Sequence, residues 1–165
     1  MTIAVDARRQ VIDYLQAHRV MTLATVGEGG PCAAAVFYAS RELEFYFVSA
    51  PRSRHCSNVQ VDPRVAATIH EDYAQWSAIQ GVQLSGSVRE LEDAEIDPAR
   101  TLFASKFPDV PLQQGASGPV ANAVLKARWY VLSATWLRFI DNSRMFGHRN
   151  EWSRAEFIAA GDATP

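Results

Sequence analysis

Residues 21–49 read MTLATVGEGGPCAAAVFYASRELEFYFVS, and this stretch decides the fold class. Side chains over 21–26 follow a period of two, which is typical of a β-strand. The glycine-rich segment 27–31 has turn chemistry, so it predicts a hairpin to the apolar run 32–39. After a short polar turn, residues 43–49 are rich in aromatic and β-branched side chains. The stretch therefore predicts a three-stranded meander whose apolar second strand is buried on both faces.

Similar patterns extend outward from this stretch. Residues 3–18 carry apolar side chains at helical spacing and predict an amphipathic helix. The polar segment 51–60 favours a short surface helix, and 92–107 favours a longer one. Three further segments read as strands, namely 65–70, 82–88 and 129–140. The last alternates over its whole length, so we expect it to be covered on both faces.

The order of these elements limits the possible architectures. Six strands joined mostly by short turns, with helices at only three places, fit neither a parallel α/β sheet nor an all-β sandwich. A mostly β fold with peripheral helices, built as a six-stranded antiparallel barrel, fits this order. We expect one domain over residues 1–165. A closed barrel also removes the sheet edges that apolar strands would otherwise expose.

The composition is that of an ordinary globular protein. The 165 residues are 48% hydrophobic and 21% charged, with a formal net charge of −2. This balance gives no reason to expect a nucleic-acid or membrane partner. The longest apolar run is far shorter than the roughly 18 residues of a spanning helix. The first nine residues lack the apolar stretch of a secretory signal, so we expect a cytoplasmic protein with Cys32 and Cys56 reduced and inert.

The sequence lacks the common motifs of nucleotide-binding proteins, metalloproteases and serine hydrolases. His70, Glu71 and Asp72 are potential metal ligands in a row. Neighbours on a strand point to opposite faces, however, and no second histidine lies at ligand spacing. We therefore predict no metal site.

The densest polar segment is 49–58, SAPRSRHCSN, where the third strand of the meander leads into the short helix. Two guanidinium groups, an imidazole, three hydroxyls and a helix N-terminus on one turn suit a phosphate dianion. A serine-capped surface helix with solvated arginines explains the same composition equally well. From the residues alone, both interpretations stay open.

The order of six short segments gives the chain a family resemblance. The segments are MTLATV at 21–26, the glycine-rich turn with Pro31, VFY at 36–38, the strand 43–49, Ser53-x-His55-x-x-Asn58 followed by DPRVA at 62–66, and GVQLSG at 81–86. In this order they resemble the pyridoxamine 5′-phosphate oxidase-like, FMN-binding split barrel. Asp141-Asn142-Ser143-x-x-Phe146-Gly147 is similar to a small bacterial branch of that superfamily.

The resemblance implies a homodimer that binds FMN in a cleft between its subunits. Members hold the FMN phosphate with a Ser-x-Lys turn, which corresponds here to Ser53, Arg54 and His55. Because histidine replaces the usual lysine, Arg52 or Arg54 would supply the cation. The remaining positions that we assign to the cofactor are Thr22, Thr25, Phe37, Tyr38, Ser49, Asn58, Trp76 and Gln83. Strand packing alone explains the positions on the first two strands equally well, and a barrel tryptophan is more often a core residue.

Two functions from different classes fit these features. The first is an FMN-dependent oxidoreductase acting on an unidentified small molecule, in which the flavin carries the redox chemistry and no side chain must act as acid or base. The second is a non-catalytic split-barrel protein that holds flavin, haem or another planar ligand. Arg144, His148 and Arg149 do not match the basic residues with which the true oxidase grips pyridoxal phosphate, which argues against vitamin B6 oxidation.

Overall fold

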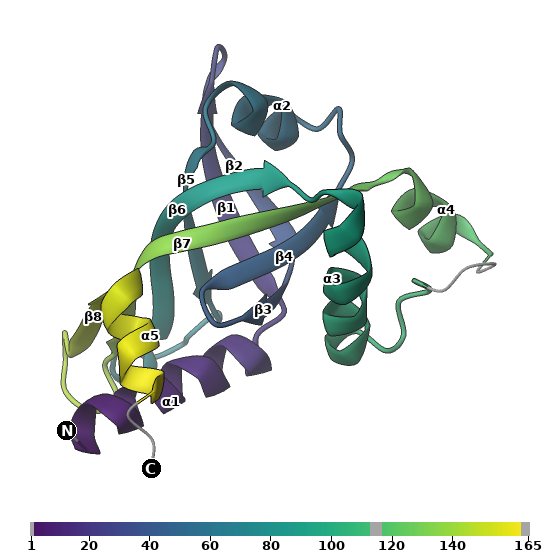
Figure 1. The fold of residues 1–165 in the computed structure, drawn as a ribbon. Helices are drawn as coiled ribbons and strands as arrows, with labels where there is room; N and C mark the ends of the chain where they lie inside the picture. Colours follow the sequence, from purple (N-terminus) through teal and green to yellow (C-terminus); the bar gives the residue numbers. More distant parts are fainter. Residues whose placement is uncertain (1, 113–116, 163–165) are drawn as a thin grey trace.

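The computed structural model describes residues 2–112 and 117–162, and its centre is one antiparallel sheet (Figure 1). The strands are β1 (Val20–Gly27), β2 (Gly30–Phe37), β3 (Ala39–Arg41), β4 (Glu44–Ser49), β5 (Arg64–His70), β6 (Gln80–Glu90), β7 (Arg128–Asp141) and β8 (Arg149–Ser153). They lie in the order β2-β1-β5-β6-β7-β4-β3, with β8 also paired to β7. The helices are α1 (Thr2–Ala17), α2 (Arg54–Val61), α3 (Asp93–Lys106), α4 (Pro119–Lys126) and α5 (Arg154–Asp162), and η1 (Trp76–Ala78) is a short 3-10 turn.

Strand β7 organises the sheet because it pairs with three neighbours. It runs beside β6 over most of its length, beside β4 at its start and beside β8 at its end. The β6–β7 register shifts between Ser85 and Gly86, where a side chain on Gly86 would collide with the Ser133 carbonyl. Strands β2 and β4 approach one another without pairing, so the curled sheet forms a split barrel.

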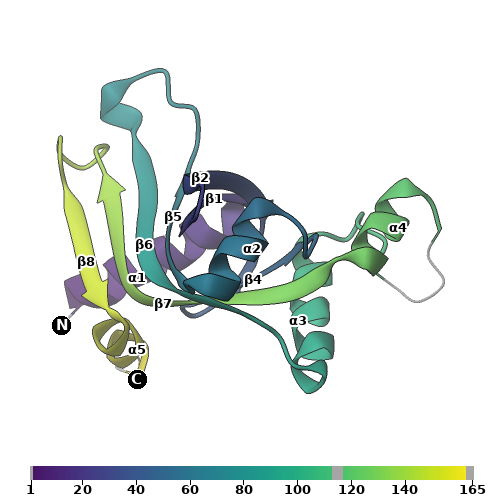
Figure 2. The same ribbon diagram turned by 90° about the horizontal axis from the view of Figure 1, so that it is seen from above.

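The barrel is filled by alternate side chains of its strands and closed at both ends by helices. Inward side chains such as Leu23, Ile69 and Leu137 are fully buried, and the Phe47 and Tyr130 rings stack inside. Helix α1 covers one end of the barrel and α2 covers the other, while α4 projects away from it (Figures 1 and 2). Among the described residues, no helix is both long and apolar enough to cross a membrane.

The predicted fold class is confirmed, and each predicted helix and strand has its counterpart within a few residues. The strand count differs, because the described residues form eight strands rather than six. The short β3 occupies part of the predicted polar turn. Strand β8 lies after residue 140, where we predicted no element. Helices α4 and α5 were also missed, since each is short and lacks the long periodic pattern that identifies a helix.

Two expectations for the meander are wrong. Strand β4 pairs with β3 and β7 rather than with β2, because the chain turns at Tyr38 and carries β4 to the other side of the barrel. Strand β2 lies at the edge of the sheet order, and its side chains are exposed at alternate positions instead of buried on both faces. Two of these four exposed residues are alanines, whose small apolar area costs little free energy when exposed.

Candidate functional site

The start of α2 gathers three of the predicted site residues. His55 Nε2 lies 2.7 Å from Ser49 Oγ and 3.2 Å from Ser53 Oγ, and the two hydroxyl oxygens are 3.4 Å apart. Ser49 ends β4, whereas Ser53 and His55 begin the helix, so the turn at 50–52 folds the segment back on itself. Ser49, Ser53 and His55 therefore form a cluster of two hydroxyls and one imidazole at the N-terminus of α2, which we call the α2 cluster.

The first turn of α2 has unpaired amide donors. Ser53 occupies the N-cap position with extended backbone, but its side chain makes no capping hydrogen bond and bonds His55 instead. The amides of Arg54, His55 and Cys56 have no hydrogen-bond acceptor within the described part of the chain; the first amide of this turn to be bonded is that of Ser57, which donates to the Ser53 carbonyl. Such donors at a helix N-terminus are satisfied by water or by a bound anion.

The two arginines of the turn have different environments. Arg54 Nη2 donates to the carbonyls of Gly29, Gly30 and Pro31, which ties α2 to the β1–β2 hairpin. Arg52 is exposed and makes no hydrogen bond or ion pair with any residue of 2–112 or 117–162. Arg52 is therefore the cation that remains available at this helix end.

Thr25 and Asn58 form a buried link beneath the same helix. Asn58 Nδ2 donates to Thr25 Oγ1 over 3.0 Å, and both side chains are almost inaccessible to solvent. A side chain at Gly27 would collide with the Asn58 amide, so the glycine lets α2 approach β1 this closely. This link positions α2 from below and does not itself reach the surface.

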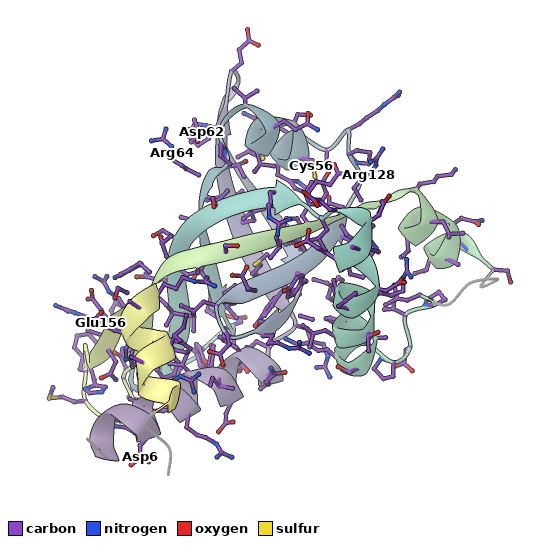
Figure 3. The ribbon with its side chains drawn as sticks, in the orientation of Figure 1. Asp6, Cys56, Asp62, Arg64, Arg128 and Glu156 are labelled. Carbon is purple, nitrogen blue, oxygen red and sulfur yellow. The ribbon has the colours of Figure 1, made fainter. Side chains whose placement is uncertain are left out.

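Cys56 and Tyr130 extend the cluster into the core, and sequence reasoning missed both. Figure 3 shows Cys56 on the side of α2 that faces Arg128, away from Asp62 and Arg64. Burial alone would raise the pKa of the Cys56 thiol, but the nearby side chains of His55, Ser53, Tyr130 and Ser49 lower it to about 7. Burial and the thiol raise the pKa of Tyr130, whose hydroxyl has no partner of normal hydrogen-bond geometry among the described residues.

A shallow groove runs over the outer face of β1, β5 and β6. It has a volume of about 370 Å³, and its lining includes Thr22, Ala24, Ala66, Gln83 and Trp136. The lining combines small side chains of β1 and β5 with Gln83 of β6 and Trp136 of β7. The structure thus brings Thr22 and Gln83 together in one groove, apart from the serine and histidine cluster.

Phe37 and Tyr38 lie apart from both features. The Tyr38 ring is completely buried, and its hydroxyl donates to the Leu15 carbonyl of α1 over 2.8 Å. Phe37 is exposed at the end of β2, where its ring meets Phe107 edge-on. Neither side chain is brought to the start of α2.

Trp76 belongs to a second polar cluster, at the end of the sheet formed by β6 and β7. The buried Asp141 carboxylate accepts hydrogen bonds from Gln10, Gln80 and Ser143. Burial alone would raise the pKa of Asp141, but these hydrogen bonds lower it. The neighbouring Asn142 donates to the Trp76 carbonyl and accepts from the Gly147 amide. This arrangement holds Trp76 against Phe146 with both rings largely exposed.

Comparison with known proteins identifies the family of this split barrel. The family model described as pyridoxamine 5′-phosphate oxidase matches residues 7–140, which include every strand of the barrel except β8. The chain belongs to the pyridoxamine 5′-phosphate oxidase family.

A relative in sequence and two solved structures of similar fold carry different names. The UPF0306 protein of Enterobacter sp. (strain 638) is 32% identical over 126 residues, which cover 76% of this chain and 80% of that protein. The structure of a heme binding protein from Mycobacterium smegmatis has a TM-score of 0.71 at 21% identity, covering 94% of this chain and 60% of the other. HutZ, a heme storage protein from Vibrio cholerae, has a TM-score of 0.62 at 18% identity, covering 76% and 88%. The two structures show the split-barrel fold.

The pyridoxamine 5′-phosphate oxidase match covers the region that contains the start of α2. The matched residues include both β4 and α2, whose junction carries the unpaired amides. The Asn142–Trp76 contact, β8 and α5 depend on residues beyond the match.

The two groups missed at the α2 cluster, Cys56 and Tyr130, lie far apart in the sequence. The one available signal was the place of Cys56 in the first turn of a predicted helix, where thiol pKa values fall.

Proposed function

We propose that this chain binds FMN with its phosphate at the first turn of α2 and acts as an FMN-dependent oxidoreductase on a small molecule. The observation that carries the proposal is the set of unpaired amides at Arg54, His55 and Cys56. Backbone donors and the helix dipole both favour an anion at this position. Membership of the pyridoxamine 5′-phosphate oxidase family supports a flavin as the source of that anion.

The residues around this turn fit a phosphate group. The hydroxyls of Ser49 and Ser53 and the imidazole of His55 already converge, and Arg52 is an unengaged cation beside them. Arg54 would contribute chiefly by fixing the helix to the hairpin, because one of its terminal nitrogens is occupied. A bound flavin would supply hydride and electron transfer, while the protein binds and orients it.

We further propose that the protein is a cytoplasmic homodimer whose subunits meet across the outer face of β1, β2 and β5. Val26 and Phe37 are more than half exposed on this face, next to a row of exposed alanines. A contiguous apolar surface of this kind is costly in water and is typical of an interface. The groove that holds Thr22 and Gln83 lies on the same face, so a second copy would enclose it.

The phosphate contact is tested by titrating FMN and riboflavin into the wild type and into Arg52→Gln. We expect Arg52→Gln to weaken FMN by about tenfold and riboflavin by less than twofold, since only FMN carries the phosphate and charge-assisted hydrogen bonds contribute this much. Arg19→Gln is the matched control, because Arg19 is also exposed and lies outside the α2 cluster. Equal losses for FMN and riboflavin would contradict the proposed phosphate position.

Hemin is the competing ligand in the same titration, because two proteins with this fold are named for heme. Binding of hemin without binding of FMN would replace the flavin proposal with a haem-binding function. Turnover is tested on the FMN-loaded protein by adding NADH or NADPH without oxygen and following the visible flavin spectrum. Tight FMN binding with no reduction by either donor would favour the non-catalytic binding protein.

The homodimer is tested by sedimentation of Phe37→Asp. A charge in an apolar interface disfavours association, so we expect this variant to sediment as a monomer and the wild type at twice the chain mass. Leu125→Asp is the control, since Leu125 is even more exposed than Phe37 but lies on α4, away from the proposed interface. Sedimentation of the wild type as a monomer would contradict the proposed interface.

A further inference from the structure

A second hollow is lined by residues of α1, α5 and the β3–β4 turn. Figure 1 shows α1 and α5 near one another at the end of the barrel opposite α2. This hollow has a volume of about 510 Å³, within the range of small-molecule sites. Its lining includes Arg8, Arg41, Tyr46, Arg154 and Ile158, none of which contributes to the α2 cluster or to the groove on β1 and β5. Any ligand here would be independent of the proposed flavin.

Two of the three arginines in the hollow are fixed by the protein. Arg8 donates to the Phe157 carbonyl and to Glu42, each over 2.8 Å. Arg154 donates to the Ala134 carbonyl and forms an ion pair with Glu44. These contacts neutralise both glutamates and hold the walls of the hollow in place.

Arg41 is the third arginine and is left without a counterion. Its guanidinium makes no hydrogen bond, ion pair or ring contact with any residue in the described ranges 2–112 and 117–162. Three arginines against two glutamates give the lining a net charge of +1. Two smaller hollows beside α3 also border Arg41, so its side chain has open space on several sides.

The surroundings of Arg41 suit an anion attached to an apolar body. The half-buried Tyr46 ring and the partly exposed Ile158 side chain provide apolar surface, and the Tyr46 hydroxyl has no hydrogen-bond partner among the described residues. Burial raises the pKa of Tyr46, so this hydroxyl stays a donor. Glu42 adopts a φ of 53° as the first residue of the two-residue turn between β3 and β4, where hairpin geometry favours a positive φ.

We propose that the hollow between α1, α5 and the β3–β4 turn binds a small organic anion, with its carboxylate or phosphate on Arg41 and its apolar body against Tyr46 and Ile158. Guanidinium groups bind carboxylates and phosphates through two parallel hydrogen bonds. The group that Arg41 would recognise is therefore an oxyanion, either a planar carboxylate or a tetrahedral phosphate.

The test measures binding of benzoate, phenyl phosphate and the neutral benzyl alcohol by calorimetry and ligand-detected NMR. We expect at least one anion to bind the wild type and the alcohol not to bind. The anion that binds more tightly shows whether the site prefers a carboxylate or a phosphate. Arg41→Gln should weaken that anion by about tenfold, the usual loss for one charge-assisted contact. Tyr46→Phe should weaken it by a smaller factor.

Two control variants separate this site from other positive charges. Arg19→Gln removes another exposed arginine, and Arg52→Gln removes the cation of the α2 cluster. Neither should change the affinity of the anion at Arg41 by more than twofold. Failure of both anions to bind, or equal losses in Arg41→Gln and either control, would overturn the proposal. Loss in Arg52→Gln alone would assign the anion to the α2 cluster instead.

Discussion

The two polar clusters of the barrel use similar groups but differ in how completely these groups are paired. At Asp141, the buried carboxylate is matched by donors from Gln10, Gln80 and Ser143. At the start of α2, three amides have no acceptor within the described residues, and the buried Tyr130 hydroxyl has none of normal geometry. Buried polar groups are nearly always satisfied in stable proteins, so the paired Asp141 cluster indicates a structural role. The unpaired amides at the start of α2 are open to water or to an anion.

The largest expected effect is at the filled cluster. Asp141→Ala leaves several donors without their acceptor, and we expect it to lower the free energy of unfolding by about 3 kcal/mol. Urea denaturation at neutral pH measures this change. Asp141→Asn retains one acceptor oxygen and should cost less. An unchanged unfolding midpoint in Asp141→Ala would contradict a structural role for the Asp141 cluster.

Next in size is the buried link beneath α2. Asn58→Ala removes the donor to Thr25 Oγ1 and leaves a small cavity, so we expect a loss of about 2 kcal/mol in the same experiment. Thr25→Ser keeps the hydroxyl and serves as the control with a smaller loss. If both variants were as stable as the wild type, the link would not position the helix.

A smaller, pH-dependent effect is expected at Cys56. The folded protein lowers the pKa of this thiol to about 7, below its ordinary value near 9. The thiolate is therefore favoured by folding, and its contribution is complete above about pH 9 and lost as the pH falls through 7. The stability of the wild type relative to Cys56→Ser should accordingly rise between pH 7 and pH 9. Urea denaturation at pH 6, 7.5 and 9 measures the difference, and a constant difference would contradict the lowered pKa.

The smallest expected effect on stability is at Ser53. A conventional N-cap serine contributes about 1 kcal/mol, but this one bonds His55 rather than the helix amides, so Ser53→Ala should cost less than about 0.5 kcal/mol. Its effect should appear instead as weaker FMN binding. Glu95→Ala is the comparison variant, because Glu95 accepts a hydrogen bond from the Glu92 amide at the start of α3 and should cost more stability. If Ser53→Ala lost more stability than Glu95→Ala, α2 would be an ordinary surface helix capped by Ser53.

The sequence was sufficient for most of the barrel because its strands carry strong local signals. The glycine-rich turn at 27–31 predicts the β1–β2 hairpin, and the alternation at 129–140 predicts β7. The pairing of β4 with β7 could not be predicted in this way, because it depends on a turn at Tyr38 and on a partner roughly 80 to 90 residues away. Local patterns determine which segments are strands, whereas long-range packing determines their neighbours.

The candidate site was predictable only in its local part. Ser49, Ser53 and His55 lie within seven residues, so their clustering follows from one tight turn. That Arg54 bonds the hairpin while Arg52 remains unengaged depends on how closely α2 approaches β1, which the composition does not encode. Tyr130 joins the cluster from a distant strand, and the proposed anion site at Arg41 combines elements from both ends of the chain.

The triple pairing of β7 has a consequence for how the protein opens. Because β7 is hydrogen-bonded to β6, β4 and β8, local fluctuations that detach β3 or β8 leave its central ladder intact. Backbone amides in the middle of β7 should therefore exchange with solvent deuterium only through global unfolding, while those of β8 and β3 exchange through partial opening. In such a hierarchy the β7–β6 ribbon is the last cooperative unit to separate, and the β3 turn that bears Arg41 can move without disturbing it.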